Sequence, residues 1–230
     1  DLSVNVIDRW RMNKIQQRAL EAAKIEQKLQ EARLELALHQ IKPHFLQNAL
    51  MSIKVLCRTR PKEAEQAVYD FAVFLRGNMN ALESAEMIPF REECKTIERY
   101  LHIEKIRFGE RLQVQWDLQE EKFRIPPLTI QPLVENAVCH GICQKMEGGT
   151  VQIRSFRKNG EICVQILDDG AGFDTEKLKD ADGSAIRNLK LRLKEFLNAD
   201  LEIESRKGEG CRQTIHIPWE ETDDENYSDR

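Results

Sequence analysis

A histidine in the segment QIKPHFLQN has a setting that would suit a nucleophile. In a helix, Leu38, Ile41 and Phe45 lie along one apolar stripe. His44 lies about 100° from the centre of that stripe, so its imidazole is expected at the edge of a helix bundle, within reach of a visiting domain. Because neutral imidazole is a nucleophile, His44 could accept a phosphoryl group. A capping or surface histidine has the same spacing, and spacing alone favours that interpretation.

The segment PPLTIQPLVENAVCHG places an acid and an amide on one helix. There Glu135, Asn136 and His140 would lie on adjacent faces. A carboxylate and an amide oxygen side by side suit a hydrated Mg²⁺, which prefers hard oxygen ligands. By composition alone this signal is weak, because polar residues of an amphipathic helix usually just face solvent.

A predicted strand that ends in Asp-x-Gly-x-Gly is the third candidate. Asp168 would lie at the end of the strand, and Gly170 and Gly172 would free the backbone to approach a ligand. An acid beside glycine-rich backbone suits a purine amino group. A calcium loop is the competing interpretation, but Phe173 and the small number of acids oppose it.

Two further signals are weak. Gly183-Ser184-Ala185 precede a predicted helix that carries Asn188, and a helix N-terminus after a glycine is an anion site in principle. Cys139, His140 and Cys143 could form a metal cluster on one helix. Zinc is the less favoured interpretation there, because no second pair of ligands stands nearby.

Residues 1–42 are predicted to form one long helix. Apolar residues recur every seven positions at Ile15, Ala22, Leu29 and Leu36, with Ile25 and Ala32 at the second seam position. Arg18 and His39 also fall on that second position, so the seam is imperfect. The pattern favours a parallel coiled coil that joins two copies of the chain; a single amphipathic helix on its own domain is the alternative.

Three more helices are predicted before Gly109, at Pro43 to about Cys57, Pro61–Asn80 and Pro89–Phe108. The second and third carry an apolar stripe at spacings of three and four, and each begins at a proline, which suits the first helical turn. Residues 1–108 are therefore expected to be all helical, an antiparallel hairpin that dimerises into a bundle.

From Gly109 onward the pattern changes to strands. Strands are predicted at 112–118, 151–156, 162–167, 201–205 and 213–217, and helices at 128–143 and 185–198. Lys158-Asn159-Gly160 and Lys207-Gly208-Glu209-Gly210 are hairpin signals. The expected fold class is α+β, with a mixed sheet covered by helices on one face.

Composition excludes several classes of protein. The formal charge of the 230 residues is −4, and residues 219–230 hold six acids and one arginine, which leaves the rest near +1. A near-neutral body argues against direct nucleic-acid binding. The longest run without charged residues, Pro43–Ile53, is too short to span a membrane. The six cysteines indicate free thiols in a reducing cytoplasm, and the first residue, Asp1, predicts a piece of a longer protein.

Taken in chain order, these segments resemble the cytoplasmic part of a bacterial sensor histidine kinase of the LytS/YesM type, from about Leu34 to Pro218. QIKPHFLQN resembles the phosphoacceptor box of that family, RYLHIEKIRFGERL its linker, PPLTIQPLVENAVCHG its N box and DDGAGFD its first glycine box. GSAIRNLKLRLKEF and KGEGCRQTIHIP resemble its later glycine-containing box and its closing hairpin. The order of these motifs is specific, although no single motif is.

The resemblance implies a long helical dimerisation hairpin followed by an α/β sandwich ATPase domain of the GHKL type. It divides the chain into a signalling coiled-coil helix (1–42), a dimerisation and phosphoacceptor region (43–110), an ATP-binding catalytic domain (111–218) and an acidic tail (219–230). It also implies ATP as the phosphoryl donor and Mg²⁺ as the metal.

Residue roles follow from the same resemblance. His44 would be the phosphoacceptor, and Glu135 would belong to the water shell of Mg²⁺. The implied nucleotide-binding and metal-binding set is Asn136 (the Mg²⁺ ligand), His140, Asp168 (which reads the adenine amino group), Gly170, Gly172, Gly183 and Asn188.

The implied function is autophosphorylation of His44 within a homodimer, followed by transfer to an aspartate in the receiver domain of a response regulator. The chain would be the cytoplasmic portion of a cell-membrane sensor, attached only through a missing N-terminal region. The alternatives are a nucleotide-binding dimer with weak or lost kinase activity that signals through conformation, and a phosphatase of the regulator.

This sequence departs from the family pattern at four places: Gln47 replaces Phe or Tyr, Cys139 replaces Lys or Arg, Ser184-Ala185 replace an apolar residue and a second glycine, and Cys211 replaces Thr. The changes at 139 and 185 are nearest the phosphates. Together they predict weak ATP binding or a slow kinase.

Overall fold

The structure is a computed structural model that describes residues 43–83, 86–174 and 184–219, together with 14, 17, 20, 21, 24 and 26–28. Its contacts divide the chain into one unit that ends at Gln47 and a second that begins at Asn48. The described residues among the first 42 are helical. The seam positions of the predicted coiled coil lie outside the described residues, so the coiled coil stays a prediction.

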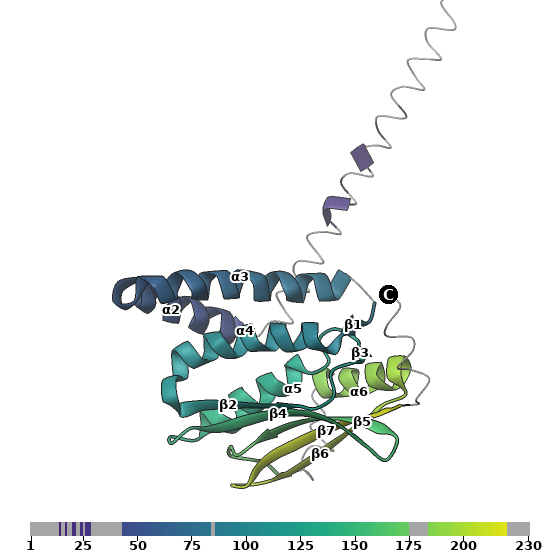
Figure 1. Cartoon of the computed structure of the whole chain (residues 1–230). Coiled ribbons are helices and arrows are strands. Elements are labelled where there is room, and N and C mark those ends of the chain that lie inside the picture. Colours follow the sequence, from purple (N-terminus) through teal and green to yellow (C-terminus); the bar gives the residue numbers. More distant parts are fainter. Residues whose placement is uncertain are drawn as a thin grey trace, which may run out of the picture. The chain divides into compact units, whose positions relative to one another are not determined.

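Helices dominate the chain before the sheet. They are α2 (Pro43–Thr59), α3 (Pro61–Glu83) and α4 (Phe90–Phe108), which a short 3₁₀ helix (Gly109–Arg111) follows (Figure 1). Ile53, Leu56, Ala64 and Ala67 form a small buried core, against which Phe71 and Ile106 pack. Three helices therefore meet at one apolar centre. None of the described helices is long and apolar enough to cross a membrane.

The prediction that residues 1–108 are all helical is wrong at one point. Ile88–Pro89 form a short strand, β1, that pairs antiparallel with β3 (Arg124–Ile125). Pro89 has φ −56° and ψ 136°, which is extended backbone, so α4 begins one residue later than predicted, at Phe90. The proline precedes the helix instead of opening it.

Five strands form the main sheet, in the order β2-β4-β5-β7-β6. Their bounds are β2 Leu112–Leu118, β4 Gly149–Lys158, β5 Glu161–Asp168, β6 Asp200–Arg206 and β7 Gly210–Pro218. β2 runs parallel to β4, and the other neighbours are antiparallel. Each predicted strand is present, and the mixed α+β sheet domain is confirmed.

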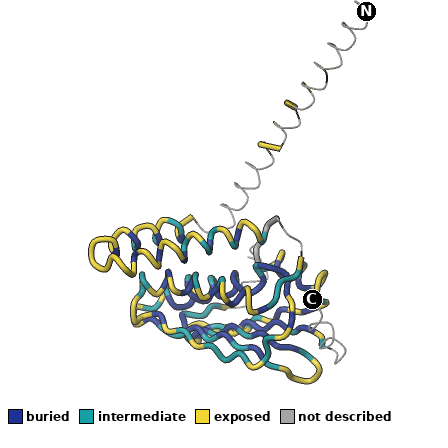
Figure 2. The backbone as a smooth tube through the Cα atoms, turned by 45° about the horizontal axis from the view of Figure 1, so that its top comes forward, coloured by how far each residue is buried: buried dark blue, intermediate teal, exposed yellow. Residues whose placement is uncertain are grey.

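One face of this sheet is covered by helices. Figure 1 shows α4, α5 (Gln131–Asn136) and α6 (Ser184–Leu197) over the same face, and no described helix covers the other. In Figure 2 the buried positions concentrate between these two layers. The alternation along β5, where Ile162, Val164 and Ile166 are fully buried, turns every second side chain toward the helices.

The predicted helix at 128–143 begins later than expected and changes type. α5 continues as a π-helix (Ala137–Gly141) and then as a 3₁₀ turn (Ile142–Gln144). Leu128 has a φ of 57°, and Thr129 Oγ1 donates a hydrogen bond to the Pro126 carbonyl oxygen, so a turn occupies 126–129. A π-helical turn widens the helix and often accompanies functional sites.

Candidate functional site

The N-terminus of α5 is held by an acid from another helix. The Glu93 carboxylate on α4 accepts hydrogen bonds from the backbone N–H groups of Ile130 (2.5 Å) and Gln131 (3.1 Å). These are among the donors that a helix start leaves without an internal partner. Burial raises the pKa of Glu93 to about 7, and the backbone hydrogen bonds oppose that rise. The linker helix α4 therefore fixes where α5 begins.

Gln131 connects α5 to α3 and orients a predicted site residue. Its Nε2 donates to Asn78 Oδ1 at 2.9 Å and to Glu135 Oε1 at 2.8 Å. Glu135 and Asn136 are half-buried on neighbouring positions of α5, and His140 is exposed on the π-helical turn. The predicted carboxylate and amide are thus side by side on one helix, and a buried glutamine holds the carboxylate in place.

The π-helical turn ends at Gly141, where the helix touches the loop that follows β5 (residues 169–173, hereafter the glycine loop). A Cβ on Gly141 would lie 2.8 Å from the Asp168 carboxyl carbon, and a Cβ on Gly170 would lie 2.6 Å from the Gly141 carbonyl oxygen. Ala171 N–H donates to that same Gly141 oxygen at 3.1 Å. Side chains at 141 or 170 would therefore force the helix and the loop apart. Gly141 is the last residue of the motif PPLTIQPLVENAVCHG, and its contact with the loop was not predicted from the sequence.

Asp168 lies at the end of β5, on the helix-covered face. Its side chain is 7% exposed, and Oδ1 accepts a hydrogen bond from Gly170 N–H at 3.0 Å. Burial, reinforced by the charge of Asp169, raises the pKa of Asp168 to about 6, while nearby backbone N–H groups and Lys145 oppose the rise. The carboxylate is a buried acceptor that the backbone N–H groups of Gly170 and Cys211 keep in a fixed orientation.

Cys211 stands directly across the sheet from Asp168. The two residues are register partners of β7 and β5, so their side chains leave the same face of the sheet. Burial and the Asp168 carboxylate raise the pKa of the Cys211 thiol to about 12. The thiol therefore stays protonated near neutral pH and presents a neutral, weakly polar group where the family usually has threonine.

The turn between β6 and β7 packs on the glycine loop. Gly208 N–H donates to the Ala171 carbonyl oxygen at 2.6 Å, and Phe173 N–H donates to Ser205 Oγ at 3.0 Å. Gly172 has a φ of +56°, and its α-carbon faces backbone of that turn, so another residue would be both strained and crowded there. The loop is held by the helix on one side and by the hairpin on the other.

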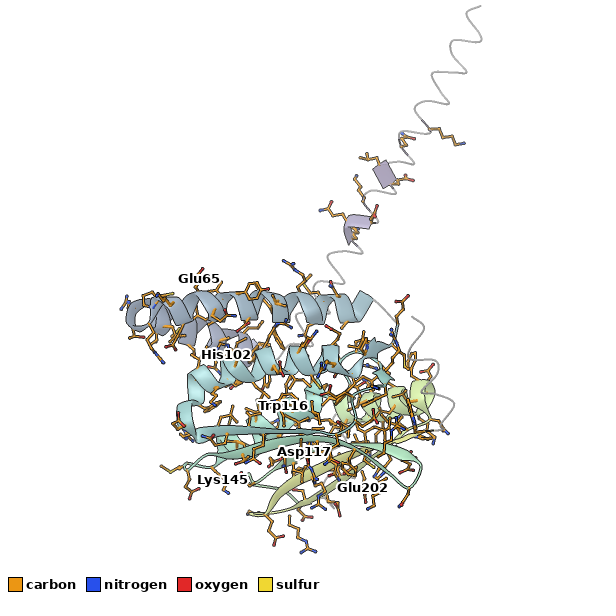
Figure 3. The ribbon with its side chains drawn as sticks, in the orientation of Figure 1. Glu65, His102, Trp116, Asp117, Lys145 and Glu202 are labelled. Atoms are coloured by element: carbon orange, nitrogen blue, oxygen red, sulfur yellow. The ribbon has the colours of Figure 1, made fainter. Side chains whose placement is uncertain are left out.

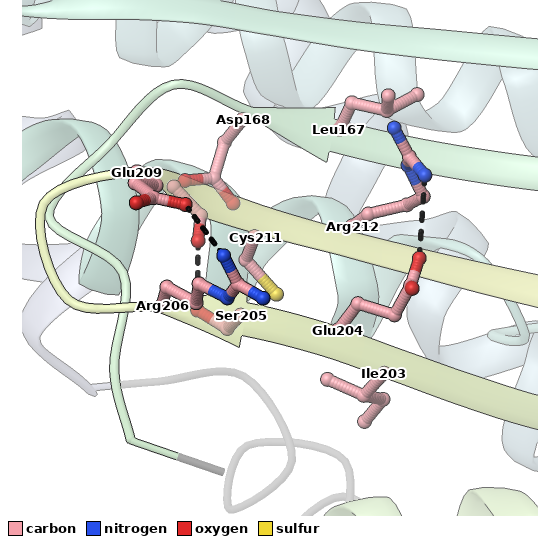
Figure 4. A pocket seen from close by; sticks show the side chains of 10 residues that line it. Leu167, Asp168, Ile203, Glu204, Ser205, Arg206, Glu209, Cys211 and Arg212 are labelled. Atoms are coloured by element: carbon pink, nitrogen blue, oxygen red, sulfur yellow. Dashed lines mark hydrogen bonds and ion pairs between the residues drawn. The ribbon is translucent and has the colours of Figure 1, made fainter.

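A cavity of about 490 Å³ opens at this corner of the sheet (Figure 4). Its volume lies in the range of small-molecule sites. Its lining comes from the ends of β5, β6 and β7: Leu167, Asp168, Ile203, Glu204, Ser205, Arg206, Glu209, Gly210, Cys211 and Arg212. One buried carboxylate, one thiol and close glycine backbone suit a flat heterocycle that carries an amino group.

Two other predicted site residues lie on or near α6. Asn188 is exposed on this helix, and Gly183 lies outside the described residues. Ser184, at the first position of α6, replaces the apolar residue that the family usually has, and the structure describes no side chain for it. Arg192, further along α6, donates a hydrogen bond to the Pro127 carbonyl oxygen and thus ties α6 to the start of the α5 segment.

Lys145 was not predicted as part of the site. Its Nζ donates to the Asp169 carbonyl oxygen at 2.6 Å and thus holds the loop that follows β5 (Lys145 is labelled in Figure 3). Cys139, which replaces a basic residue in the family, is half-buried with Sγ 3.9 Å from Tyr100 Oη on α4. Lys145 therefore supplies a positive charge in direct contact with the backbone of this loop.

His44 is exposed in the first turn of α2. It belongs to the unit that ends at Gln47, whereas Glu135, Asn136 and Asp168 belong to the unit that begins at Asn48. Of these predicted residues, Asp168 lines the cavity at the end of the sheet, whereas Glu135 and Asn136 are not among the residues that line it. The predicted phosphoacceptor belongs to the other unit.

The residues present fit a nucleotide and a magnesium ion. Gly141 and Gly170 bring the helix and the loop into direct contact, and Asp168 offers a buried acceptor beside them. Glu135 and Asn136 supply hard oxygen donors that Mg²⁺ prefers. About five helical residues, or about 7 Å of helix, separate Asn136 from Gly141. The proposed metal-binding pair therefore shares one continuous helical segment with Gly141, the residue that contacts Asp168 of β5.

Two family models match this chain. A histidine kinase model matches residues 32–112, and the model described as histidine kinase-, DNA gyrase B- and HSP90-like ATPase matches residues 127–221. The second description implies ATP binding by the sheet domain. Together the two models cover both the helical half and the sheet half.

Curated relatives agree with these models. The uncharacterized protein YwpD of Bacillus subtilis (strain 168) is 36% identical over 203 residues, which are 84% of this chain and 73% of that protein. The sensor protein LytS of Bacillus cereus (strain ATCC 14579) is 31% identical over 204 residues, 83% of this chain and 34% of LytS. The chain thus spans about a third of the sensor protein's length.

Among solved structures, the histidine kinase domain of the blue-light activated histidine kinase EL346 from Erythrobacter litoralis is similar at a TM-score of 0.49 and 17% identity. The match covers 86% of this chain and 96% of that domain.

Proposed function

The chain belongs to the LytS-type sensor histidine kinase family, and from this premise we propose that it transfers the γ-phosphoryl group of ATP to His44 and then to an aspartate of a response regulator. The observation that carries the proposal is the buried Asp168 carboxylate beside the glycine cradle, at the mouth of a cavity of about 490 Å³. It gives the sheet domain a specific acceptor for an adenine amino group.

The base end of the nucleotide site is built from backbone and one carboxylate. Asp168 Oδ1 accepts a hydrogen bond from Gly170 N–H, and the remaining acceptor capacity of this buried carboxylate would bind the amino group of adenine. Cys211, on the neighbouring strand, packs beside the ring. Because the carboxylate is buried, a hydrogen bond to it is worth more than one made in water.

The phosphate end is formed by α5 and α6. Glu135 and Asn136 would hold the hydrated Mg²⁺, Asn136 as a ligand and Glu135 through the water shell. Mg²⁺ supplies neutralisation of the charge on the phosphates. His140 and Asn188, both exposed, would contact the phosphates, and the resemblance assigns Gly183 to the same end of the nucleotide. Positioning and charge neutralisation provide most of the rate in such a transfer, and no protein nucleophile other than the acceptor is needed.

His44 acts as the acceptor in its neutral form. The bond between the γ-phosphorus and the bridging oxygen breaks, a bond from phosphorus to an imidazole nitrogen forms, and ADP leaves. In the second step the nitrogen–phosphorus bond breaks and the phosphoryl group passes to a carboxylate oxygen of the regulator. Exposure of His44 supports both steps, because the donor domain and the regulator must each reach it in turn.

A homodimer is part of this proposal. Large apolar side chains on α2 and α3 are exposed within one chain: Leu50 (56%), Met51 (62%), Val55 (60%), Val68 (50%) and Tyr69 (61%). Such a concentration on neighbouring helices is typical of an interface. A second copy, packed through the same helices, would bury these side chains in a helix bundle. Residues 1–42 would continue that pairing as a coiled coil.

We further propose that this chain lies on the cytoplasmic side of a membrane sensor whose stimulus is received by another part of the protein, since the match covers 34% of LytS. The substitutions at Cys139 and Ser184-Ala185 favour a slow kinase, because both remove groups that approach phosphate. The four domains keep the boundaries 1–42, 43–110, 111–218 and 219–230 in this proposal.

Incubation with γ-labelled ATP and Mg²⁺ tests the proposal. We expect an acid-labile, base-stable label on the wild type, no label on His44→Gln, and an unchanged label on the control His39→Gln. Calorimetry on the same three proteins should show equal ATP binding. Label that persists on His44→Gln overturns the acceptor assignment, and ATP binding with no label under any condition favours the signalling dimer without kinase activity.

A further inference from the structure

A cluster of metal-ligating side chains lies on the face of the sheet that no described helix covers. Glu161 and Cys163 come from β5, and His216 comes from β7. Cys163 and His216 are direct register partners, and Glu161 precedes Cys163 by two residues on the same side. One potential ligand atom from each residue lies within 4.8 Å of the others, and among the described residues this is the group of three that satisfies that condition.

The spacing within the cluster approaches that of a tetrahedral site. Glu161 Oε2 lies 3.0 Å from His216 Nδ1, and Cys163 Sγ lies 3.9 Å from the same nitrogen. With ordinary zinc bond lengths, the edges of a tetrahedron would be about 3.4 Å between N and O and about 3.6 Å between N and S. These two pairs are therefore within about 0.5 Å of their tetrahedral separations, a shift that side-chain rotation supplies.

A fourth residue orients the histidine ring. Glu202 Oε2, on β6, lies 3.5 Å from His216 Nε2, the ring nitrogen that faces away from Glu161 and Cys163 (Glu202 is labelled in Figure 3). A carboxylate that accepts from the second ring nitrogen of a ligating histidine fixes its tautomer and direction. Nδ1 is then left to face the other two ligands.

We infer that Glu161, Cys163 and His216 form a zinc site, with Glu202 as the partner of the histidine. One thiolate, one imidazole and one carboxylate match the ligand preferences of Zn²⁺, whereas Mg²⁺ takes oxygen ligands. A water molecule occupies the fourth position. The Cys163 thiol releases its proton to solvent when the sulfur binds the metal.

This site is separate from the nucleotide site. Cys163 and Asp168 are five residues apart on β5, so their side chains leave opposite faces of the sheet. The side chains of His216 and Glu161 are 33% and 42% exposed, which gives an ion in solution a path to them. An ion bound at the proposed zinc site would join β5 to β7, the two strands that carry Asp168 and Cys211.

The structure also separates this cluster from the one that the sequence suggested. Cys139, His140 and Cys143 are described, yet they do not meet the same distance condition. Cys139 Sγ contacts Tyr100 Oη instead, at 3.9 Å, and His140 is exposed. Ligands on neighbouring strands are brought together by register, which a pattern along one helix does not reveal.

Titration of the full chain with Zn²⁺, in competition with a chromophoric chelator, tests the inference. The wild type should bind one Zn²⁺ per chain, and Co²⁺ in its place should give the near-ultraviolet absorption of a thiolate ligand. Cys163→Ser and His216→Gln should each weaken binding at least tenfold and remove or shift that absorption. The matched control, Cys139→Ser combined with Cys143→Ser, should bind as the wild type does.

Glu202→Gln tests the positioning role. It should weaken Zn²⁺ binding about tenfold while the cobalt absorption stays, because the thiolate remains a ligand. Circular dichroism and ATP binding check that each variant is folded. The cobalt spectrum of the wild type tests thiolate ligation independently of any variant. No Zn²⁺ binding by the wild type, binding without thiolate absorption, or loss of binding in the control instead of in Cys163→Ser would overturn the site.

Discussion

The sheet domain and the α2–α3 hairpin differ in how much of their apolar surface they bury. The inner face of the sheet is closed: Ile153, Val164, Ile166 and Ile215 are fully buried. The hairpin has a small core around Leu56 and leaves larger apolar side chains exposed, such as Leu50 and Val55. The sheet domain is therefore a complete fold within one chain, whereas the hairpin presents a surface that a second copy would complete.

The two regions are joined by polar contacts that reach α4 or α5. His102 Nδ1 on α4 lies 2.6 Å from Asp70 Oδ2 on α3 (His102 is labelled in Figure 3), and Asn78 on α3 bonds to Gln131 on α5. Glu93 on α4 then holds the start of α5. The helix that carries the proposed magnesium ligand is thus positioned from the hairpin side as well as from the sheet.

The largest effect is expected in the core of the sheet domain. Ile153→Ala should lower the free energy of unfolding by about 2–5 kcal/mol, because it leaves a cavity in a closed core. Val55→Ala, on the hairpin, should change it by no more than about 0.5 kcal/mol in a single chain. Chemical denaturation at low protein concentration measures both. Equal losses in the two variants would contradict the comparison.

Glu93 should make stability depend on pH. Its pKa is about 7 in the folded chain against 4.5 when unfolded, so between these values the folded state binds more protons. Stability should therefore fall by up to about 3 kcal/mol as pH rises from about 4.5 to 7. Glu93→Gln keeps the acceptor for the α5 N–H groups and should flatten this slope. In that variant Asp168, whose folded-state pKa is raised to about 6, should still make stability fall as pH rises, but by less than Glu93 does.

Thermal unfolding at several pH values measures the slope. The matched control is Glu92→Gln, one residue earlier on the exposed side of α4. If Glu93→Gln and Glu92→Gln have the same pH profile as the wild type, Glu93 does not carry the dependence.

Nucleotide binding should reside in the sheet domain and depend on the Asp168 carboxylate. Asp168→Asn removes a charged acceptor and should weaken ATP binding about ten- to hundredfold. Wild-type affinity should decline below a pH of about 6, where the carboxyl becomes protonated, and this decline should be smaller in the variant. Asp169→Asn, whose side chain accepts from Thr150 N–H outside the cradle, is the control. Calorimetry that finds Asp169→Asn the weaker binder would reverse the assignment.

The smallest effect concerns the association of two hairpins. Val55→Glu places a charge in the proposed interface of both copies and should raise the dimer dissociation constant at least tenfold, since buried unpaired charge is costly. Gln115→Glu adds the same charge at an exposed position of β2 and should leave association unchanged. Sedimentation equilibrium measures both. A monomeric wild type, or equal weakening by the two variants, would show that α2 is not the interface.

Local patterns made much of the sheet domain predictable. Alternation located β2, β4, β5, β6 and β7, and the Asn159-Gly160 pair gave the β4–β5 turn, where both residues have positive φ (54° and 78°). The β1–β3 pair was not predicted because each strand has two residues, too few to show an alternation of apolar and polar residues. The π-helical turn escaped because its sequence, AVCHG, has no local signal for that geometry.

The long-range contacts of the site could not be predicted in the same way. The motif order identified Asp168 and Asn136, but the cap from Glu93 reaches a segment 37 residues away. The contact between Gly141 and Gly170 likewise depends on the tertiary packing of the helix against the loop, where the two backbones come too close for a side chain. The cluster at Glu161, Cys163 and His216 depends on strand register, which pairs β5 with β7 although α6 and β6 lie between them in the sequence.

The central claim is that a nucleotide site in the sheet domain phosphorylates His44 in the separate helical unit. Peptide mapping by mass spectrometry, after incubation with ATP and Mg²⁺ and with handling at alkaline pH, tests it most directly. The account predicts one phosphoryl group on the peptide that contains His44, absent when Asp168→Asn is incubated at an ATP concentration that saturates only the wild type. A phosphoryl group on another residue, or none on a wild type that binds ATP, would contradict the account.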